Sequence, residues 1–225
     1  MNDNIDLSHC RLYIVSPRKM DPLAFAPTMV KALDAGDVAS FLLRLEGMDD
    51  EEVMHAIEIL MPIAHDRDVA FFLDGKIALA KKTECDGVHL GQHDVNAADA
   101  RKILGPDKTI GVTCHDSKHL GMTAAESGAD YVSFGPFFPP RLPSSGPGAT
   151  PRPLVSPDIL AWWQETMEVP CVAAGGIRAP NCGDLVRAGA DFVCTSTGIW
   201  EHPAGAAVAV RAFNDAIARA SQENA

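Results

Sequence analysis

The sequence has little of what membrane proteins, secreted proteins and nucleic-acid-binding proteins need. No apolar run approaches the roughly 18 residues of a membrane-spanning helix, and Met1 to Asp6 is acidic, unlike the basic start of a signal peptide. Acidic residues outnumber basic ones by 30 to 19, and a net charge of −11 opposes binding to nucleic acid or anionic lipid. We therefore expect a cytoplasmic protein with small-molecule partners, acting on neither nucleic acid nor a membrane.

Cysteine pairs with metal-binding or redox spacing are also absent. The chain has six cysteines but no Cys-x-x-Cys motif, and four of them fall in or beside stretches with the pattern of buried strands. We interpret them as buried, reduced thiols rather than as disulfides. They are Cys10, Cys85, Cys114, Cys171, Cys182 and Cys194.

Low-complexity stretches are missing too, and 47% of the 225 residues are hydrophobic, enough for one large α/β domain or two small ones. Short apolar runs alternate with segments of helical spacing. We expect strands within residues 11–15, 35–44, 68–74, 86–90, 109–113, 130–135, 169–174 and 191–195. We expect helices at 23–33, from Asp49 or Asp50 onward, and at 76–82, 96–104, 117–127, 158–166, 179–188 and 204–220.

A short repeat opens every second expected strand. A glycine or cysteine is followed by aspartate and an apolar run at Gly36–Val38, Cys85–Val88, Gly128–Val132 and Gly189–Val193. Eight strands alternating with helices, with a repeat on each pair, favour a closed (β/α)8 barrel over an open sheet. We predict a single TIM-barrel domain over residues 1–225, interrupted by one long Pro/Gly/Ser-rich loop at 136–153.

In such a barrel the C-terminal strand ends meet at one mouth, where active sites form. Asp74 ends the third expected strand, and Asp94 follows the fourth. Two carboxylates with phosphate oxygens and water are a common Mg²⁺ ligand set, so we predict Mg²⁺ at this pair. The alternative is that Asp74 only caps the helix after it.

Other polar groups and glycines fall at the same mouth. Gly175-Gly176 and Thr197-Gly198 follow the seventh and eighth strands, where backbone N–H groups bind phosphate in many barrels. Gln92 and His115 follow the fourth and fifth strands. The simpler interpretation of any one such turn is a solvated loop, because polar loops are common.

Two histidine pairs raise zinc as a weaker alternative. His89 and His93 are four residues apart, as are His115 and His119. Because His89 would lie in a strand and His93 in a turn, their four-residue spacing does not place the two side chains on one helix face.

The chain resembles the thiamin-phosphate synthase family, which also contains thiazole tautomerases. The resemblance runs from Leu12 to Ile199. Its most specific piece is Gly87-Val-His-Leu-Gly-Gln-His-Asp94, supported by Asp74 with Ala78-Leu-Ala80, Gly111-Val-Thr-Cys-His115, Ala129-Asp-Tyr-Val132 with Gly135-Pro-Phe-Phe-Pro139, and Ala174-Gly-Gly-Ile177.

The resemblance implies coupling of hydroxymethylpyrimidine diphosphate to a thiazole phosphate, with release of diphosphate. In that chemistry Mg²⁺ and cationic side chains draw off the diphosphate, and the thiazole nitrogen captures the pyrimidine cation. Asp74 and Asp94 match the family's metal ligands, Arg44 and Thr113 match groups at the diphosphate, and Gly175, Gly176 and Thr197 match the thiazole-phosphate cradle. We add Gln92, His115 and Gly198 as substrate-binding residues and leave a homodimer open.

Several positions depart from the family pattern. Leu42, Glu46, Leu73 and Gly75 stand where the family has glutamine, lysine, asparagine and arginine, and Pro140 and Pro143 replace a threonine and a lysine. Glutamate in place of lysine exchanges attraction of a diphosphate for repulsion, and Arg141 or Arg152 are candidates to compensate. Two alternatives therefore stand beside the synthase: a tautomerase-like or otherwise altered enzyme, and a non-catalytic paralogue that binds a phosphorylated thiamin precursor.

Overall fold

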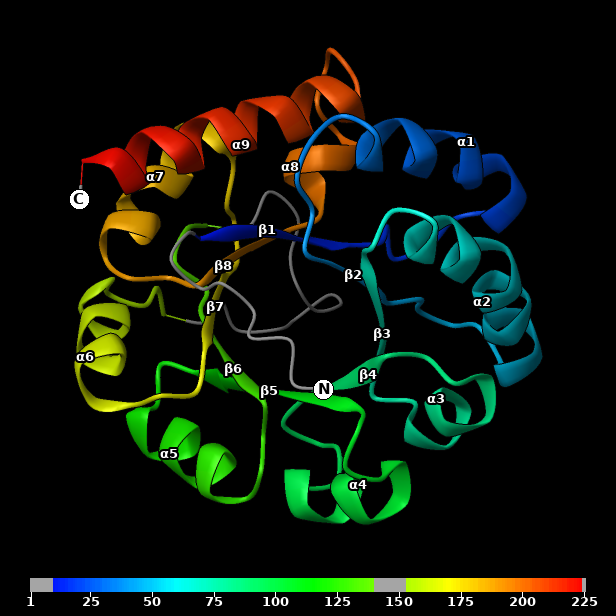
Figure 1. Cartoon of the computed structure of the whole chain (residues 1–225), viewed down its shortest axis with the longest axis horizontal. Coiled ribbons are helices and arrows are strands. Elements are labelled where there is room, and N and C mark those ends of the chain that lie inside the picture. The colour runs from blue at the N-terminus through cyan, green and yellow to red at the C-terminus, as the bar shows by residue number, and fades with distance from the viewer. Residues whose placement is uncertain (1–9, 140–152, 224–225) are drawn as a thin grey trace.

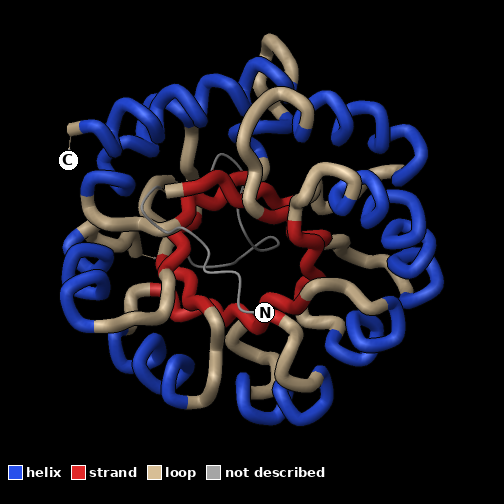
Figure 2. The backbone as a smooth tube through the Cα atoms, viewed as in Figure 1, coloured by secondary structure: helices blue, strands red, loops and turns tan. Residues whose placement is uncertain are grey.

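The computed structural model describes residues 10–139 and 153–223, and they form a closed barrel of eight parallel strands. The strands follow one another in sequence order around the barrel, and β1 closes it by pairing with β8. Figure 1 shows the helices in a ring outside the strands, and Figure 2 shows the strands as the inner ring. The predicted (β/α)8 barrel is therefore confirmed, while the assignment of residues 1–225 to one domain stays a prediction.

The elements lie close to their predicted positions. The strands are β1 Arg11–Val15, β2 Ser40–Leu43, β3 Ala70–Asp74, β4 Gly87–Leu90, β5 Thr109–His115, β6 Tyr131–Phe134, β7 Cys171–Ala174 and β8 Phe192–Thr195. The helices are α1 Pro22–Leu33, α2 Asp50–His65, α3 Ile77–Thr83, α4 Ala97–Leu104, α5 Lys118–Glu126, α6 Asp158–Thr166, α7 Ala179–Arg187, α8 Thr197–Trp200 and α9 Ala206–Gln222. Two features differ from the sequence prediction: β5 runs two residues further, and the short helix α8 was not expected.

Helix starts follow the capping residues in the sequence. The Asp49 side chain accepts hydrogen bonds from the backbone of Glu51 and Glu52 and forms a capping box, so Asp49 rather than Asp50 is the cap of α2. The Asn96 side chain accepts from Asp99 N at the start of α4, and Gly105 ends that helix, in agreement with the helix expected at 96–104.

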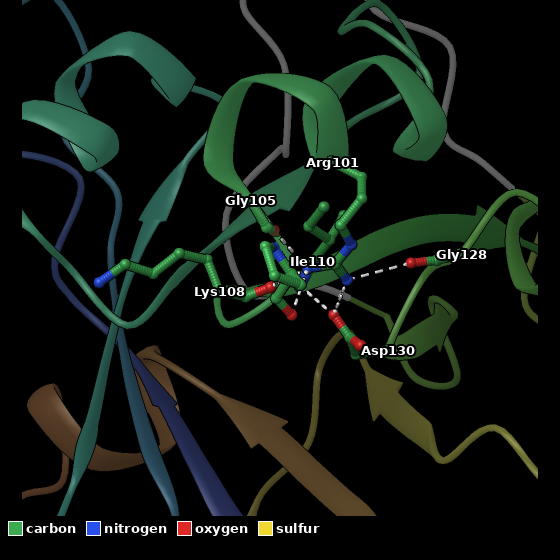
Figure 3. Close-up of polar contacts among 7 residues, drawn as sticks. Arg101, Gly105, Lys108, Ile110, Gly128 and Asp130 are labelled. Atoms are coloured by element: carbon green, nitrogen blue, oxygen red, sulfur yellow. Dashed lines mark hydrogen bonds and ion pairs between the residues drawn. The ribbon is translucent and has the colours of Figure 1, made fainter.

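The repeated aspartates make contacts between neighbouring segments at the N-terminal end of the barrel. Asp130, just before β6, accepts a 2.7 Å hydrogen bond from the backbone N–H of Ile110 in β5 and a 2.5 Å bond from Arg101 Nη2 (Figure 3). Asp86 and Asp191 likewise accept from the backbone of the preceding strand, at 2.6 and 2.7 Å. Asp37 departs from this pattern, since it pairs with the Arg11 guanidinium at 2.6 Å. The repeat therefore belongs to the scaffold, at the end opposite the mouth.

Apolar side chains fill two regions. The larger core lies between strands and helices and includes the fully buried Trp163. The smaller one, inside the barrel, comprises Tyr13, Val15, Leu42, Phe72, Tyr131 and Val172. All six cysteines are free thiols, and five of them are buried.

Two further expectations concern the 136–153 loop and membrane-spanning helices. Pro140, Arg141, Pro143 and Arg152, in the expected 136–153 loop, lie outside the described residues. Within the described ranges, no helix combines the length and apolar character needed to cross a bilayer.

Candidate active site

The two predicted metal ligands lie at adjacent strand ends. Asp74 is the last residue of β3, whose register aligns it with His89 of β4. Asp94 follows β4, and its Oδ2 accepts a 2.7 Å hydrogen bond from Gly91 N. A Cβ on Gly75 would lie 3.1 Å from both Asp94 carboxylate oxygens, and Gly75 has φ +69°. Glycine at position 75 therefore lets the Asp94 carboxylate lie against the residue that follows Asp74.

Asp74 does not cap the next helix. The cap position of α3 is Lys76, and it makes no side-chain capping hydrogen bond. Burial raises the pKa of Asp74; Arg44 and Arg18 oppose the rise, while Asp94 and Glu46 add to it. A half-buried carboxylate beside a second carboxylate is costly to ionise, and a divalent cation between them would relieve that cost. The donor set therefore fits Mg²⁺.

Arg44 enters the site from the end of β2. Its backbone N–H donates to Ser16 Oγ at 2.9 Å, and Ser16 Oγ donates to its carbonyl oxygen at 3.0 Å. Its Nε is buried and has no hydrogen-bond partner among the described residues. A buried guanidinium N–H without an acceptor is costly, and an anionic ligand would satisfy it.

Thr113 ends a hydrogen-bonded row of side chains inside the barrel. His89 Nε2 lies 2.7 Å from Thr113 Oγ1, and His89 Nδ1 lies 3.0 Å from the Tyr131 hydroxyl. Burial lowers the pKa of His89 to about 4, and the charge of Arg44 acts in the same direction. Both ring nitrogens of His89 already have partners, which argues against His89 as a zinc ligand.

Gln92 and His115 line a cavity of about 270 Å³, together with Asp116, Leu120, Gly135, Pro136, Pro153 and Val155. The pairing register of β5 with β6 shifts between Thr113 and His115, and His115 has φ +55°. A non-glycine residue in this conformation costs energy, and such outliers gather at functional sites. The longer β5 therefore turns His115 into the cavity wall.

The glycine turn after β7 and the end of β8 form the opposite side of the mouth. Thr195 Oγ1 donates to the Ile177 carbonyl oxygen at 2.9 Å and so ties the two segments together. Gly176 has φ +68°, and a Cβ there would collide with the Phe138 carbonyl oxygen. The N–H groups of Gly176, Thr197 and Gly198 donate to no other described residue. An anion bound at these N–H groups stays a prediction.

The family model described as thiamine monophosphate synthase matches residues 12–199. The chain belongs to this family. The thiamine-phosphate synthase of Rhodospirillum centenum is 51% identical over 92% of this chain and 98% of its own. That of Erythrobacter litoralis is 43% identical over 93% and 96%. The solved structure of a thiamine phosphate pyrophosphorylase from Pyrococcus furiosus superposes with a TM-score of 0.81 at 22% identity, covering 95% of this chain and 98% of that one.

Membership of the thiamine monophosphate synthase family makes the departures at β2 and β3 informative. Leu42 and Leu73, where the resemblance places glutamine and asparagine, are buried in the two cores. Glu46 is exposed and forms an ion pair with Arg18, and its backbone N–H donates to the Arg18 carbonyl oxygen at 2.9 Å. The acid at the position of the family lysine is therefore paired with an arginine, and the expected repulsion is offset.

Arg18 is a residue that sequence reasoning missed. It lies in the loop between β1 and α1, two residues past Ser16, at the mouth. Its position just after a strand end could have indicated a residue of the mouth. Its ion pair with Glu46 could not be predicted, because the two residues lie in different loops. The sequence pattern indicates only strand positions for Tyr13 and Tyr131 and gives no sign of their hydrogen bonds.

Proposed function

We propose that the protein is a thiamin-phosphate synthase that couples hydroxymethylpyrimidine diphosphate to a thiazole phosphate and releases diphosphate. One observation carries the assignment: the buried Arg44 Nε without an acceptor lies in the same charged cluster as Asp74 and Asp94. That cluster suits a metal-bound diphosphate. The relatives at 51% and 43% identity are named synthases over nearly their whole length, so tautomerase and non-catalytic roles are not favoured.

In this proposal Asp74 and Asp94 hold Mg²⁺, which neutralises charge on the departing diphosphate when bound. Arg44 donates to the diphosphate through the Nε that lacks an acceptor. Arg18 adds a second cation and is kept at the mouth by Glu46. The enzyme's contribution is charge stabilisation and positioning, because the reaction needs no side-chain nucleophile.

The other predicted residues bind the two substrates. Thr113 donates to the diphosphate, and Gln92 and His115 contact substrate from the wall of their cavity. The N–H groups of Gly176, Thr197 and Gly198, with Gly175 shaping the turn, hold the thiazole phosphate. Six free cysteines suit the reducing cytoplasm, where we place the enzyme. A homodimer stays a prediction that light scattering tests.

The test is a condensation assay with both substrates and Mg²⁺, following thiamin phosphate and diphosphate together. Equimolar appearance of the two products is expected, and removal of Mg²⁺ with a chelator should stop both. The same protein is then given a thiazole tautomer alone. Tautomerisation without condensation would replace the synthase assignment with the altered-enzyme alternative, and binding without either reaction would leave the non-catalytic one.

A further inference from the structure

Four side chains inside the barrel form a continuous hydrogen-bonded row that ends at the mouth. The Tyr13 hydroxyl lies 2.8 Å from the Tyr131 hydroxyl, Tyr131 lies 3.0 Å from His89 Nδ1, and His89 Nε2 lies 2.7 Å from Thr113 Oγ1. Both tyrosines are buried. The rings of His89 and Tyr131 stack with centroids 5.6 Å apart, which fixes the geometry of the row.

The direction in which this row donates its protons decides what Thr113 can do. If Thr113 donates to His89 Nε2, its hydroxyl has no proton left for a ligand. His89 Nδ1–H then donates to Tyr131, and Tyr131 donates to Tyr13. The Tyr13 hydroxyl proton is left without an acceptor, because Tyr13 has no other hydrogen-bond partner among the described residues.

The opposite direction gives every donor in the row an acceptor except the Thr113 hydroxyl, which is only partly buried. Tyr13 donates to Tyr131, Tyr131 donates to His89 Nδ1, and His89 Nε2–H donates to Thr113 Oγ1. The Thr113 hydroxyl proton then points away from the row and is free for an acceptor at the mouth. A buried donor without a partner costs more than a typical hydrogen bond contributes, so this direction is favoured. A protonated His89 would also donate from Nε2, so this result does not depend on the charge of the ring.

We propose that Tyr131 and His89 are positioning residues that orient the Thr113 hydroxyl as a hydrogen-bond donor toward the substrate diphosphate. The two residues act on the substrate only through Thr113. Tyr131 is the decisive member, because its hydroxyl makes Nδ1 an acceptor and so places the proton on Nε2. Tyr13 contacts only Tyr131, and without the Tyr13 hydroxyl Tyr131 would still donate to His89 Nδ1, so Tyr13 is the matched control. The inference rests on the proposed role of Thr113.

The first test compares two matched Tyr→Phe variants. Tyr131→Phe removes the donor to Nδ1 and should lower kcat about fivefold, the factor that one ordinary hydrogen bond contributes to an equilibrium. Tyr13→Phe removes a hydroxyl from the same row but leaves His89 as the acceptor for Tyr131, so kcat should stay within about twofold. Equal losses of kcat in the two variants would overturn the proposal, since a purely structural role predicts them.

Thr113 itself provides the second comparison. Thr113→Ala should lower kcat by about 100-fold, the scale of one lost donor to developing charge, and Thr113→Ser should restore most of it. In the Thr113→Ala background, Tyr131→Phe should have no further effect on kcat. A full fivefold loss there would show that Tyr131 acts by another route. If Thr113→Ala leaves kcat unchanged, the proposed role of Thr113 fails and the spectroscopic test below judges the row alone.

The direct readout is the tautomer of His89 in the ¹⁵N-histidine-labelled wild-type protein. Long-range ¹H–¹⁵N correlation spectra, assigned by the signals lost in His89→Gln, should show a proton on Nε2. Tyr13→Phe should keep that tautomer, and Tyr131→Phe should convert part of it to the Nδ1–H form. A bare Nε2 in the wild-type protein would overturn the proposal whatever the kinetics show.

Discussion

At the scale of single residues, the two carboxylates of the mouth differ in burial and in the charges around them. Asp74 is half-buried, and burial raises its pKa, with Asp94 and Glu46 adding to the rise against two arginines. Asp94 instead is exposed and anchored through Gly91 N. Removing Asp94 should therefore weaken metal binding while leaving the core untouched.

Asp94→Ala should abolish Mg²⁺-dependent diphosphate binding with little change in melting temperature, because a mouth carboxylate contributes little to the core. Titration calorimetry of diphosphate with and without Mg²⁺ measures the first effect, and thermal unfolding measures the second. Asp107→Ala, an exposed acid in the turn before β5, is the matched control and should change neither. Undiminished diphosphate binding in Asp94→Ala would remove Asp94 from the metal site.

The Arg18–Glu46 pair supports a second residue-scale prediction. Arg18→Ala leaves Glu46 unpaired and removes a cation from the diphosphate, so kcat/KM should fall about tenfold or more. Adding Glu46→Lys to that variant returns one cation to the same place and should recover most of the loss. Arg67→Ala, which breaks the Arg67–Asp34 ion pair elsewhere on the surface, is the control. If Arg18→Ala is neutral, Arg18 has no part in the diphosphate site.

The sequence could place Asp74, Asp94 and Arg44 at the mouth, because each directly ends or follows a strand with a clear apolar pattern. It could not pair Glu46 with Arg18, since their contact depends on how two loops pack. It could not order Tyr13, Tyr131, His89 and Thr113 into a row either. Those four lie on four strands, and only the register of the closed barrel brings them together.

At the scale of elements, the backbone conformation of the turn after β7 affects both loop packing and the proposed phosphate binding. Gly176 adopts φ +68° and lies directly under the Phe138 carbonyl oxygen, so the loop after β6 packs over it. Phe138 N also donates to the Gly175 carbonyl oxygen at 3.1 Å. The same turn exposes the N–H groups proposed for the thiazole phosphate, so packing and binding are coupled at this turn.

Gly176→Ala should therefore weaken binding of thiazole phosphate about tenfold or more, because the loop must shift and the N–H groups move with it. Gly47→Ala is the control: Gly47 has φ +75°, but a Cβ there meets nothing within 4 Å. It should lose some stability through backbone strain alone and keep its affinity. Calorimetry with thiazole phosphate separates the two, and equal affinities would remove the turn from the binding site.

Sequence patterns located these elements well where capping and periodicity agree, as at α4 between Asn96 and Gly105. They failed where tertiary contacts extend or create an element. β5 continues to His115 because Gly135 N donates to the His115 carbonyl oxygen at 3.0 Å, a contact between distant segments. α8 is a single turn of four residues, too short to show a helical period.

At the scale of the whole molecule, hydrogen bonds that support the fold and the groups proposed for the chemistry lie at opposite ends of the barrel. Three of the repeated aspartates, Asp86, Asp130 and Asp191, accept hydrogen bonds from backbone N–H groups at the N-terminal end. Arg101 adds hydrogen bonds to the carbonyl oxygens of Gly105, Lys108 and Gly128 (Figure 3). The charged groups proposed for the chemistry gather at the C-terminal end. Stability and activity should therefore respond to different substitutions.

Paired Asp→Asn substitutions at the two ends test that division. Asp130→Asn removes the charge from the bonds to Ile110 N and Arg101, so the free energy of unfolding should fall by about 1–3 kcal/mol while kcat at 25 °C stays within about twofold. Asp94→Asn should lower kcat and leave the free energy of unfolding nearly unchanged, since it alters a proposed metal ligand and no core contact. Urea unfolding measures the free energy of unfolding of each variant, and steady-state kinetics measure its kcat. The division would be wrong if Asp130→Asn lowered kcat as much as Asp94→Asn does, because the N-terminal ties would then control the geometry of the mouth.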